Sequence, residues 1–311
     1  MNAQSMDAVL AHHQQQTMRA VVQSAYGAPD VFGVQETARP TIGPAEVLVL
    51  VRAAGIDRGT WHLMTGKPYL LRLIFGFSRP KNQVPGFDVA GTVAEVGAQV
   101  TRFAVGDEVF GVSRGSCAEY AVAREDKLAR KPAVLSFEQA AVMGISALTA
   151  LQSLRDGGRL QPGQRVLIVG ASGGVGSYAV QLAKALGANV TGVCSTAKVE
   201  LVRSLGADQV LDYQTSDFAS SEARYDLILD IGDNASISRL RRALTPTGTA
   251  VLVGGEGGNT LIGAQLVRGL GASLLAPFRR QRVVMFMCKE HFADLEQLAK
   301  LSEAGALTPS L

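Results

Sequence analysis

The sequence predicts an α/β protein in which a doubly wound parallel sheet is joined to a second, β-rich domain. Three observations lead to this prediction. A strand, a glycine turn and a helix follow one another near the middle of the chain, strands and helices alternate after them, and short strands separated by turn signals precede them. The 311 residues, 47% hydrophobic and 18% charged, are enough for two domains with sizeable cores.

The central unit of the parallel sheet spans residues 165–187. The apolar run 166–169 is typical of a buried parallel strand, and a helical pattern follows the glycine turn. The glycines of the turn have the spacing Gly170-x-x-Gly173-x-x-Gly176, which differs by one residue from the dinucleotide fingerprint G-x-G-x-x-G. Bare backbone lets a pyrophosphate approach the helix N-terminus, where unpaired N–H groups and the helix dipole favour an anion. We therefore predict a dinucleotide site formed by Ser172, Gly173, Gly174, Val175 and Gly176.

Alternating strands and helices continue this unit as a doubly wound sheet. Two helices are expected, one over 198–205 and one over 236–244, and apolar runs predict strands over 189–194, 209–211, 227–229 and 250–253. Gly254 follows the last of these strands. Because ligands of open α/β sheets lie at the carboxyl ends of strands, Gly254 is expected to contact the cofactor. A final helix is expected over 293–304.

The N-terminal part of the chain has the pattern of a β-rich domain. Residues 1–17 are polar and glutamine-rich, and we expect them to be a disordered extension. A long irregular stretch, 55–86, is expected among the strands, where sites and lids often lie. The expected strands cover 19–22, 46–53, 89–96, 108–110 and 117–123.

Two helices are expected to lead into the parallel sheet, one capped by Ser136 and one over 146–154. The composition shows no linker between the two domains. The cleft between them is therefore the expected ligand site.

Charge and cysteine content exclude several classes of protein. The net charge is +3, and Lys and Arg are scattered, so neither nucleic acid nor an anionic membrane is expected as a partner. The three cysteines lie far apart and lack the spacings of a zinc site. No apolar run reaches the roughly 18 residues that cross a bilayer, and no signal peptide is evident. A cytoplasmic protein is expected.

The chain has a set of motifs that lie, in order, at 54–57, 85–91, 106–111, 148–150, 170–176 and 206–208. With these motifs the chain resembles the medium-chain dehydrogenase/reductase superfamily. Within that superfamily it resembles the zinc-independent quinone oxidoreductases, which include zeta-crystallin-like proteins. The resemblance implies a GroES-like catalytic domain over 18–140, a Rossmann NADP-binding domain over 141–275, and a return to the catalytic domain over 276–311. Members of the family continue past the position of Leu311, so a truncated C-terminal end is expected.

The resemblance also bears on metal. Zinc alcohol dehydrogenases of this superfamily place a cysteine where Ile56 stands and a His-Glu pair where Phe87 and Asp88 stand. Neither Ile56 nor Phe87 has a metal-binding side chain. We therefore predict no metal site.

The end of the second strand of the parallel sheet indicates NADPH as the cofactor. NAD enzymes place a carboxylate there, whereas this chain has Ser195 and Lys198, which suit a 2′-phosphate. The alternative is that Ser195 caps the next helix and Lys198 is solvated. The resemblance adds Tyr213 and Thr149 as cofactor contacts, and simple packing is the alternative for each.

Two residues of the stretch 55–86 are candidates for catalysis. Asp57 stands where quinone reductases commonly have an asparagine, and it could orient cofactor or substrate or only cap a local turn. Tyr69, like His62, is a candidate proton donor, with a structural role as the alternative. The apolar residues 70–77 are expected to form a wall beside the nicotinamide.

We predict an NADPH-dependent reductase of quinones or other activated carbonyl and enone compounds. Its partner is a small-molecule substrate, and a homodimer is compatible with the sequence. Reductive hydride transfer needs no catalytic triad, because the cofactor carries the chemistry. Two alternatives stay open. One is a 2-enoyl thioester reductase with a basic patch at Arg279, Arg280 and Arg282, and the other is a non-enzymatic NADPH-binding protein.

Overall fold

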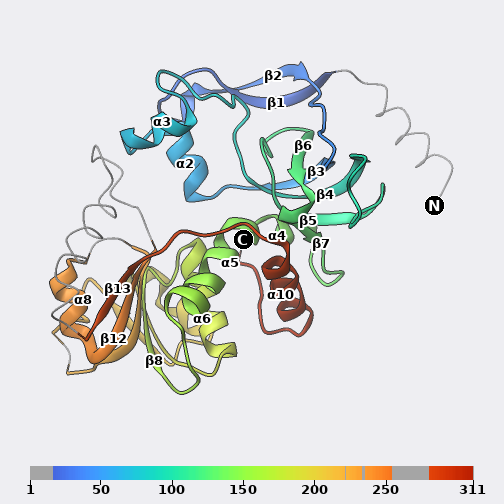
Figure 1. Ribbon diagram of the computed structural model, residues 1–311. Coiled ribbons are helices and arrows are strands. Elements are labelled where there is room, and N and C mark those ends of the chain that lie inside the picture. The colour runs from blue at the N-terminus through green and yellow to red at the C-terminus, as the bar shows by residue number, and fades with distance from the viewer. Residues whose placement is uncertain (1–16, 221, 233–234, 254–279, 311) are drawn as a thin grey trace.

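The computed structural model describes residues 17–220, 222–232, 235–253 and 280–310. These residues form two halves, each built on its own β-sheet, which lie one above the other in Figure 1 with α5 at their junction. Of the predicted N-terminal extension only Thr17 is described, and it begins strand β1 (Thr17–Gln23).

The C-terminal half contains a six-stranded sheet in which every pairing is parallel. Strand β8 lies near the middle, and the strands that follow it in sequence are added first on one side and then on the other. This reversal of direction at β8 and β11 creates the crevice in which doubly wound folds bind ligands. The strand order is β10 (Gln209–Asp212), β9 (Asn189–Cys194), β8 (Arg165–Val169), β11 (Tyr225–Asp230), β12 (Leu244–Leu252) and β13 (Arg282–Met285).

Helices connect these strands and cover the faces of the sheet. Because both faces are covered, residues in the central strands such as Leu167, Ile168 and Ile228 are fully buried. The expected helix over 236–244 is observed with Ser236 as its side-chain cap. The helices of this half are α6 (Gly174–Ala185), the short 3-10 turn η5 (Thr196–Lys198), α7 (Val199–Ser204) and α8 (Ile237–Ala243).

The N-terminal half is a five-stranded antiparallel sheet with a separate hairpin. The hairpin pairs β1, which contains the predicted strand 19–22, with β2 (Phe32–Ala38). The sequence analysis did not predict β2, because most of its side chains are exposed and carry no apolar signal. In the larger sheet the strand order is β6 (Tyr120–Arg124), β3 (Glu46–Gly55), β4 (Asp88–Val96), β5 (Glu108–Val112) and β7 (Leu128–Arg130). Two 3-10 turns, η1 (Pro29–Val31) and η3 (Glu125–Lys127), complete this half.

The stretch 55–86 is more regular than the sequence analysis predicted. It contains α2 (Arg58–Thr65), the turn η2 (Tyr69–Leu71) and the one-turn helix α3 (Arg72–Phe75). The signals that define α2 are its caps, with Asp57 at the start and Gly66, at φ 62°, at the end. With eight residues, α2 is shorter than the window over which apolar periodicity is recognised, so a search for amphipathic helices passes over it.

Helix α5 (Gly144–Gln152) joins the two halves through a shared core. It follows α4 (Phe137–Ala141), which begins with a capping box between Ser136 and Gln139, and it runs into a π-helical turn, η4 (Ser153–Gly157). Its residues Leu148 and Leu151 are buried in one cluster that extends from Phe110 of β5 to Ile168 of β8. No break in the core separates the halves.

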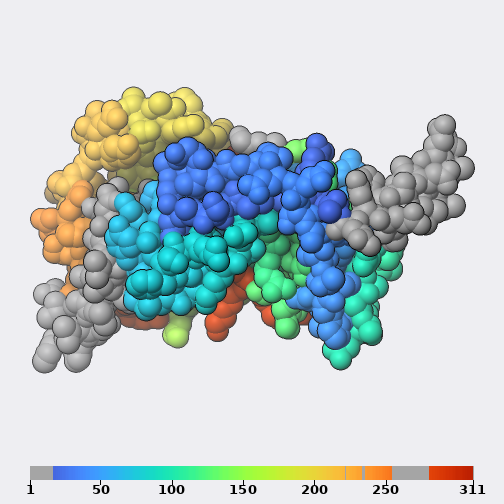
Figure 2. All heavy atoms as spheres, turned by 90° about the horizontal axis from the view of Figure 1, so that it is seen from above, coloured from blue at the N-terminus to red at the C-terminus, as the bar shows by residue number. Residues whose placement is uncertain are grey.

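The described part of residues 276–311 divides between the two halves. Strand β13 pairs in parallel with β12, so it belongs to the six-stranded sheet. Helix α10 (Phe292–Glu303) packs against β7 and α5, and its Glu296 is 2.6 Å from Arg102. The red chain in Figure 1 crosses from one half to the other between these elements. In Figure 2 the yellow and orange residues of the C-terminal half lie along one edge of the blue and cyan N-terminal half.

Candidate active site

A cleft of about 1330 Å³ lies between the two halves. One wall comes from α2 and η2, the other from the glycine turn and the carboxyl ends of the parallel strands, and α5 contributes between them. Of the site residues predicted from the sequence, eight line this cleft: Asp57, Thr149, Ser172, Gly173, Gly174, Val175, Ser195 and Tyr213. Tyr69, Gly176 and Lys198 do not line it, and Gly254 lies outside the described residues.

The glycine turn presents backbone to the cleft. Gly170 has φ 88°, in the left-handed region that favours glycine, and the carbonyl of Val193 accepts hydrogen bonds from the N–H groups of Gly170 (3.1 Å) and Ala171 (3.0 Å). Gly173 and Gly174, at the start of α6, are exposed. Because the first N–H groups of a helix have no intrahelical acceptor, this end of α6 can bind an anionic pyrophosphate.

Gly176 serves the packing of the turn. It is buried, and a Cβ atom built there would lie 2.1 Å from the carbonyl oxygen of Gly170, so any side chain would separate helix α6 from strand β8. This is the role that the third glycine has in dinucleotide-binding turns. Its contribution to cofactor binding is therefore indirect.

The end of β9 supplies polar groups without a carboxylate of its own. Ser195 and Tyr213 line the cleft, and the Ser195 side chain makes no capping hydrogen bond to η5. The neighbouring Thr196 hydroxyl donates to Asp212 Oδ2 at 2.5 Å, and Thr196 does not line the cleft. Lys198 is exposed on η5.

Arg239 is a cleft residue that the sequence analysis missed. It comes from the first turn of α8, its Nη2 donates to Asp217 Oδ1 at 2.8 Å, and its guanidinium lies 5.0 Å from the ring centre of Phe218. Beside this cation the pKa of Asp217 is lowered to about 2. The signal was available, because Ser236 caps a helix that begins just past the carboxyl end of β11, where cleft residues are expected.

Asp57 caps α2 and also lies in the cleft, so the structure leaves the predicted role in orienting a ligand open to it. Its Oδ1 accepts hydrogen bonds from the Thr60 N–H (2.8 Å) and hydroxyl (2.7 Å), which caps α2, and the residue also lines the cleft. His62 lines the cleft with Nδ1 2.7 Å from the Lys67 carbonyl oxygen. Since a carbonyl only accepts, Nδ1 carries the hydrogen in this contact. Tyr69 instead lies beside the Arg72 guanidinium, 4.8 Å from its ring centre.

The apolar residues 70–77 divide into two groups. Leu70 and Leu71 of η2 line the cleft. The next apolar side chains, Leu73, Ile74 and Phe77, do not line it and are 66%, 65% and 78% exposed. Only the first part of the predicted wall therefore faces the site.

Thr149 is positioned on α5 where that helix meets the cleft. Its hydroxyl donates to the Ile145 carbonyl at 2.7 Å, one turn earlier, and lies beside the Cys288 thiol. Burial raises the pKa of Cys288 to about 11, which keeps the thiol protonated at neutral pH. Met287, next to this cysteine, also lines the cleft.

Asp88 connects the antiparallel sheet to the start of α5. It is 2% exposed, and its Oδ1 accepts a hydrogen bond from the Ile145 N–H at 2.8 Å. Burial raises the pKa of this carboxyl well above its ordinary value, and the nearby Asp57 charge raises it further. Through this hydrogen bond Asp88 anchors the start of the helix that carries Thr149.

Ile56 and Phe87, two of the three residues compared with zinc ligands above, have apolar side chains. Ile56 lines the cleft with 73% of its surface exposed, and Phe87 packs against the shared core. In the part of the chain that the structure describes, no three His, Cys, Asp or Glu side chains are grouped to hold a metal ion.

Two family models match the chain. The model for the alcohol dehydrogenase GroES-like domain matches residues 43–133, and that for the zinc-binding dehydrogenase matches residues 174–304. The chain is 38% identical over 226 residues to the chloroplastic quinone-oxidoreductase homolog of Spinacia oleracea, covering 68% of this chain and 67% of that one. It is 34% identical over 264 residues to the chloroplastic NADPH-dependent alkenal/one oxidoreductase of Arabidopsis thaliana, covering 77% and 67%.

A solved structure shows the same fold. The quinone oxidoreductase from Coxiella burnetii superposes with a TM-score of 0.78 at 26% identity, covering 94% of this chain and 89% of that one. The chain belongs to the medium-chain dehydrogenase/reductase superfamily, among its quinone oxidoreductase-like members. This confirms the predicted family and fold class, with a Rossmann-like parallel sheet and a GroES-like half. Proteins of this family are oxidoreductases that use nicotinamide cofactors, so a small-molecule substrate is expected here too.

Among the helices of the described ranges, none has both the length and the apolar character that crossing a bilayer requires.

Proposed function

We propose that this protein is an NADPH-dependent reductase that transfers hydride to quinones or conjugated enones without zinc. The observation that carries the proposal is a single cleft in which an exposed glycine turn, a strand end without its own carboxylate at Ser195, and the apolar residues Leu70 and Leu71 face one another. The name of the relative from Arabidopsis thaliana, an NADPH-dependent alkenal/one oxidoreductase, supports the cofactor and the acceptor class.

The cleft residues fit the parts of NADPH. The N–H groups of Gly174 and Val175, at the start of α6, bind the pyrophosphate. Ser195, Tyr213 and Arg239 would hold the adenosine end, because their hydroxyls and guanidinium suit a 2′-phosphate. When bound, the reduced nicotinamide supplies the hydride.

The chain's own residues bind and orient the acceptor. Leu70 and Leu71 offer an apolar surface for a flat, electron-poor ring. Asp57 uses one carboxylate oxygen for Thr60 and orients a ligand group with the rest of its side chain. With Nδ1 bound to the Lys67 carbonyl, His62 has a proton to give from Nε2 only when its ring is charged. Solvent supplies the proton to the reduced quinone, which needs little acid assistance.

A rate comparison with matched acceptors tests the proposal. Purified protein is mixed with NADPH or NADH and with a benzoquinone, a conjugated enone, the saturated ketone of the same skeleton, or a 2-enoyl-CoA. We expect the quinone and enone to be reduced at least about a hundredfold faster than the ketone, because an unactivated carbonyl needs a strong donor or a Lewis-acid metal. Elemental analysis of the active protein should show no stoichiometric zinc.

Each other outcome assigns a different function. A preference for the 2-enoyl-CoA would favour the thioester reductase, for which Arg280 and Arg282 are exposed and Arg279 lies outside the described residues. NADPH binding without turnover of any acceptor would favour a non-enzymatic role. Oxidation of simple alcohols with bound zinc would overturn the proposal. A cytoplasmic location and a homodimer stay predictions from the sequence.

A further inference from the structure

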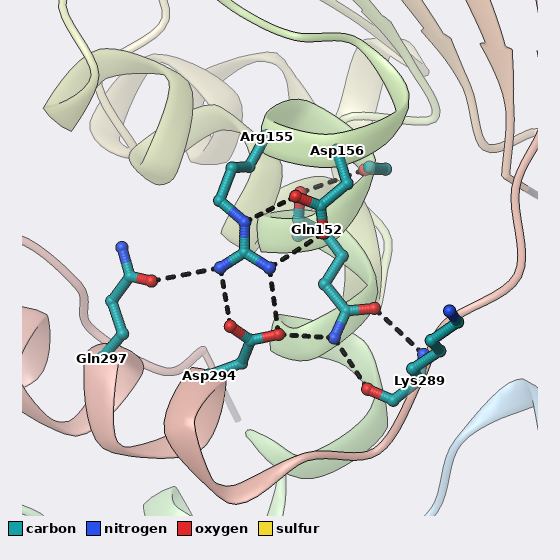
Figure 3. Close-up of polar contacts among 8 residues, drawn as sticks. Gln152, Arg155, Asp156, Lys289, Asp294 and Gln297 are labelled. Atoms are coloured by element: carbon teal, nitrogen blue, oxygen red, sulfur yellow. Dashed lines mark hydrogen bonds and ion pairs between the residues drawn. The ribbon is translucent and has the colours of Figure 1, made fainter.

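The connection between β13 and α10, residues 286–291, passes beside α5 and contributes Met287 to the cleft. Helix α5 and the turn η4 contact this connection and the start of α10 through three residues spaced by three. Thr149 lies beside the Cys288 thiol, Gln152 forms hydrogen bonds with Lys289, and Arg155 forms hydrogen bonds with Asp294, as Figure 3 shows for the last two. Residues three apart share one face of a helix, so these contacts form a continuous seam.

Gln152 is the central member of this seam. Its side-chain amide is buried and holds both backbone groups of one distant residue: Oε1 accepts from the Lys289 N–H at 2.9 Å, and Nε2 donates to the Lys289 carbonyl at 2.7 Å. Nε2 also donates to Asp294 Oδ2 at 2.7 Å. The amide orientation is set by these partners, because the N–H needs an acceptor and the carbonyl needs a donor. A carboxylate or an alkyl group cannot make both contacts.

Arg155 holds in place the Asp294 carboxylate, which accepts the hydrogen bond from Gln152. Arg155 donates to both oxygens of Asp294, at 2.6 Å and 3.1 Å, and to both oxygens of Asp156, at 2.7 Å and 2.8 Å. Figure 3 shows the guanidinium between the two carboxylates, with Asp294 turned toward Gln152. Gln297 contacts only the outer edge of this group, 3.3 Å from Arg155 Nη1.

We propose that Gln152 is a positioning residue for the reductase reaction: by holding Lys289, it fixes the course of the preceding residues Met287 and Cys288, and so places Met287 in the cleft wall. The effect of Gln152 on quinone reduction rests on the proposed function, whereas the hydrogen bonds of the seam do not depend on it. Misplacing a binding wall by about 1 Å can cost up to about a hundredfold in rate.

Two glutamine-to-leucine substitutions test this role. Gln152→Leu keeps the side-chain volume but removes all three hydrogen bonds, and Gln297→Leu makes the same chemical change at the exposed edge. In Gln152→Leu we expect the KM for the quinone to rise about tenfold or more, with a smaller change in kcat. The Kd for NADPH should stay unchanged, because the adenosine-binding residues lie away from the seam. Gln297→Leu should leave all of these constants unchanged.

Thiol labelling gives a readout that does not need catalysis. Cys288 and Cys117 are both half-buried, but only Cys288 adjoins the seam. In Gln152→Leu, Cys288 should react with a thiol reagent about tenfold faster, identified by peptide mass spectrometry, while Cys117 in the same molecules reacts at its original rate. A general loss of folding would instead accelerate both cysteines.

The outcomes separate the seam from the proposed function. Faster Cys288 labelling together with a raised quinone KM supports the positioning role. Faster labelling with an unchanged KM and kcat overturns it, and unchanged labelling shows that Gln152 does not hold the segment. A wild-type protein that binds NADPH but reduces no acceptor would refute the proposed function, while the labelling comparison would still decide whether the seam exists.

Discussion

The two walls of the cleft differ in what they present to a ligand. At the glycine turn, the wall of the Rossmann-like half presents main chain, because Gly173 and Gly174 expose backbone at the end of a buried parallel strand. The opposite wall is made of side chains, among them His62, Leu70 and Leu71 on the short elements α2 and η2. A backbone site changes little when side chains change, whereas a side-chain site is easily altered. The glycine turn should therefore keep its function when neighbouring side chains change, provided that its packed glycine Gly176 is kept, and the acceptor wall should determine substrate preference.

The glycine turn gives the strongest test of this difference. Gly176→Ala places a Cβ 2.1 Å from the Gly170 carbonyl oxygen, whereas in Gly173→Ala that same oxygen is the nearest atom, at 3.5 Å. We expect Gly176→Ala to lower the free energy of unfolding by about 3 kcal/mol or more and to abolish NADPH binding. Gly173→Ala should change stability by less than about 1 kcal/mol. Urea denaturation measures both, and equal losses would show that the turn is not packed as described.

Side chains of the cofactor wall should determine how tightly the adenosine end of NADPH is bound. Arg239 lines the cleft and Lys198 does not. Arg239→Gln should therefore weaken NADPH binding about tenfold or more and leave NADH binding unchanged, because it removes a charge-assisted contact to the 2′-phosphate. Lys198→Gln should have a smaller effect. Titration calorimetry with both cofactors checks this, and the opposite ranking would assign the phosphate contact to η5.

On the acceptor wall, a matched pair of leucines separates cleft residues from their exposed neighbours. Leu70 lines the cleft and is 43% exposed, whereas Leu73 is 66% exposed and does not line it. Leu70→Ser should raise the quinone KM about fivefold, which corresponds to about 1 kcal/mol of lost apolar contact. Leu73→Ser should not alter KM, and neither variant should change the Kd for NADPH. Steady-state kinetics that found equal effects would extend the wall along α3.

The smallest expected effect concerns Asp88, which connects the two halves through α5. Its carboxyl ionises near the ordinary value of 3.8 in the unfolded chain, whereas burial raises its pKa in the folded protein. Between these two values only the unfolded state has lost the proton, so the free energy of unfolding falls as pH rises through this window.

Asp88→Asn should reduce this pH dependence, because an amide oxygen still accepts from the Ile145 N–H and carries no proton to lose. Compared with the wild type, the free energy of unfolding of the variant should be about 1 kcal/mol more favourable at neutral pH than at acidic pH. Thermal unfolding at several pH values measures it. A variant whose pH profile matches the wild-type profile would show that Asp88 is ionised in the folded protein.

Local patterns in the sequence were enough to predict the Rossmann-like unit. The apolar run before the turn, the glycine spacing and the helix after it form one continuous stretch, and the strands that follow have the apolar content of a sheet covered on both faces. These features depend on contacts between neighbours in the chain, so periodicity and turn chemistry record them. The cofactor-side residues from Ser172 to Val175 were found in this way and line the cleft.

Only the tertiary structure decided which distant residues meet. Arg239 faces the same cleft as Ser195, Cys288 contacts Thr149, and Gln152 holds Lys289 across 137 positions of sequence. Such pairs leave no periodic signal, because each partner satisfies the rules of its own element. The sequence predicted a wall over 70–77 but not the elements α2 and η2 that form this side of the cleft. Helix α2 is short and is defined by its caps, Asp57 and Gly66, and packing decides that only Leu70 and Leu71 of the predicted wall line the cleft.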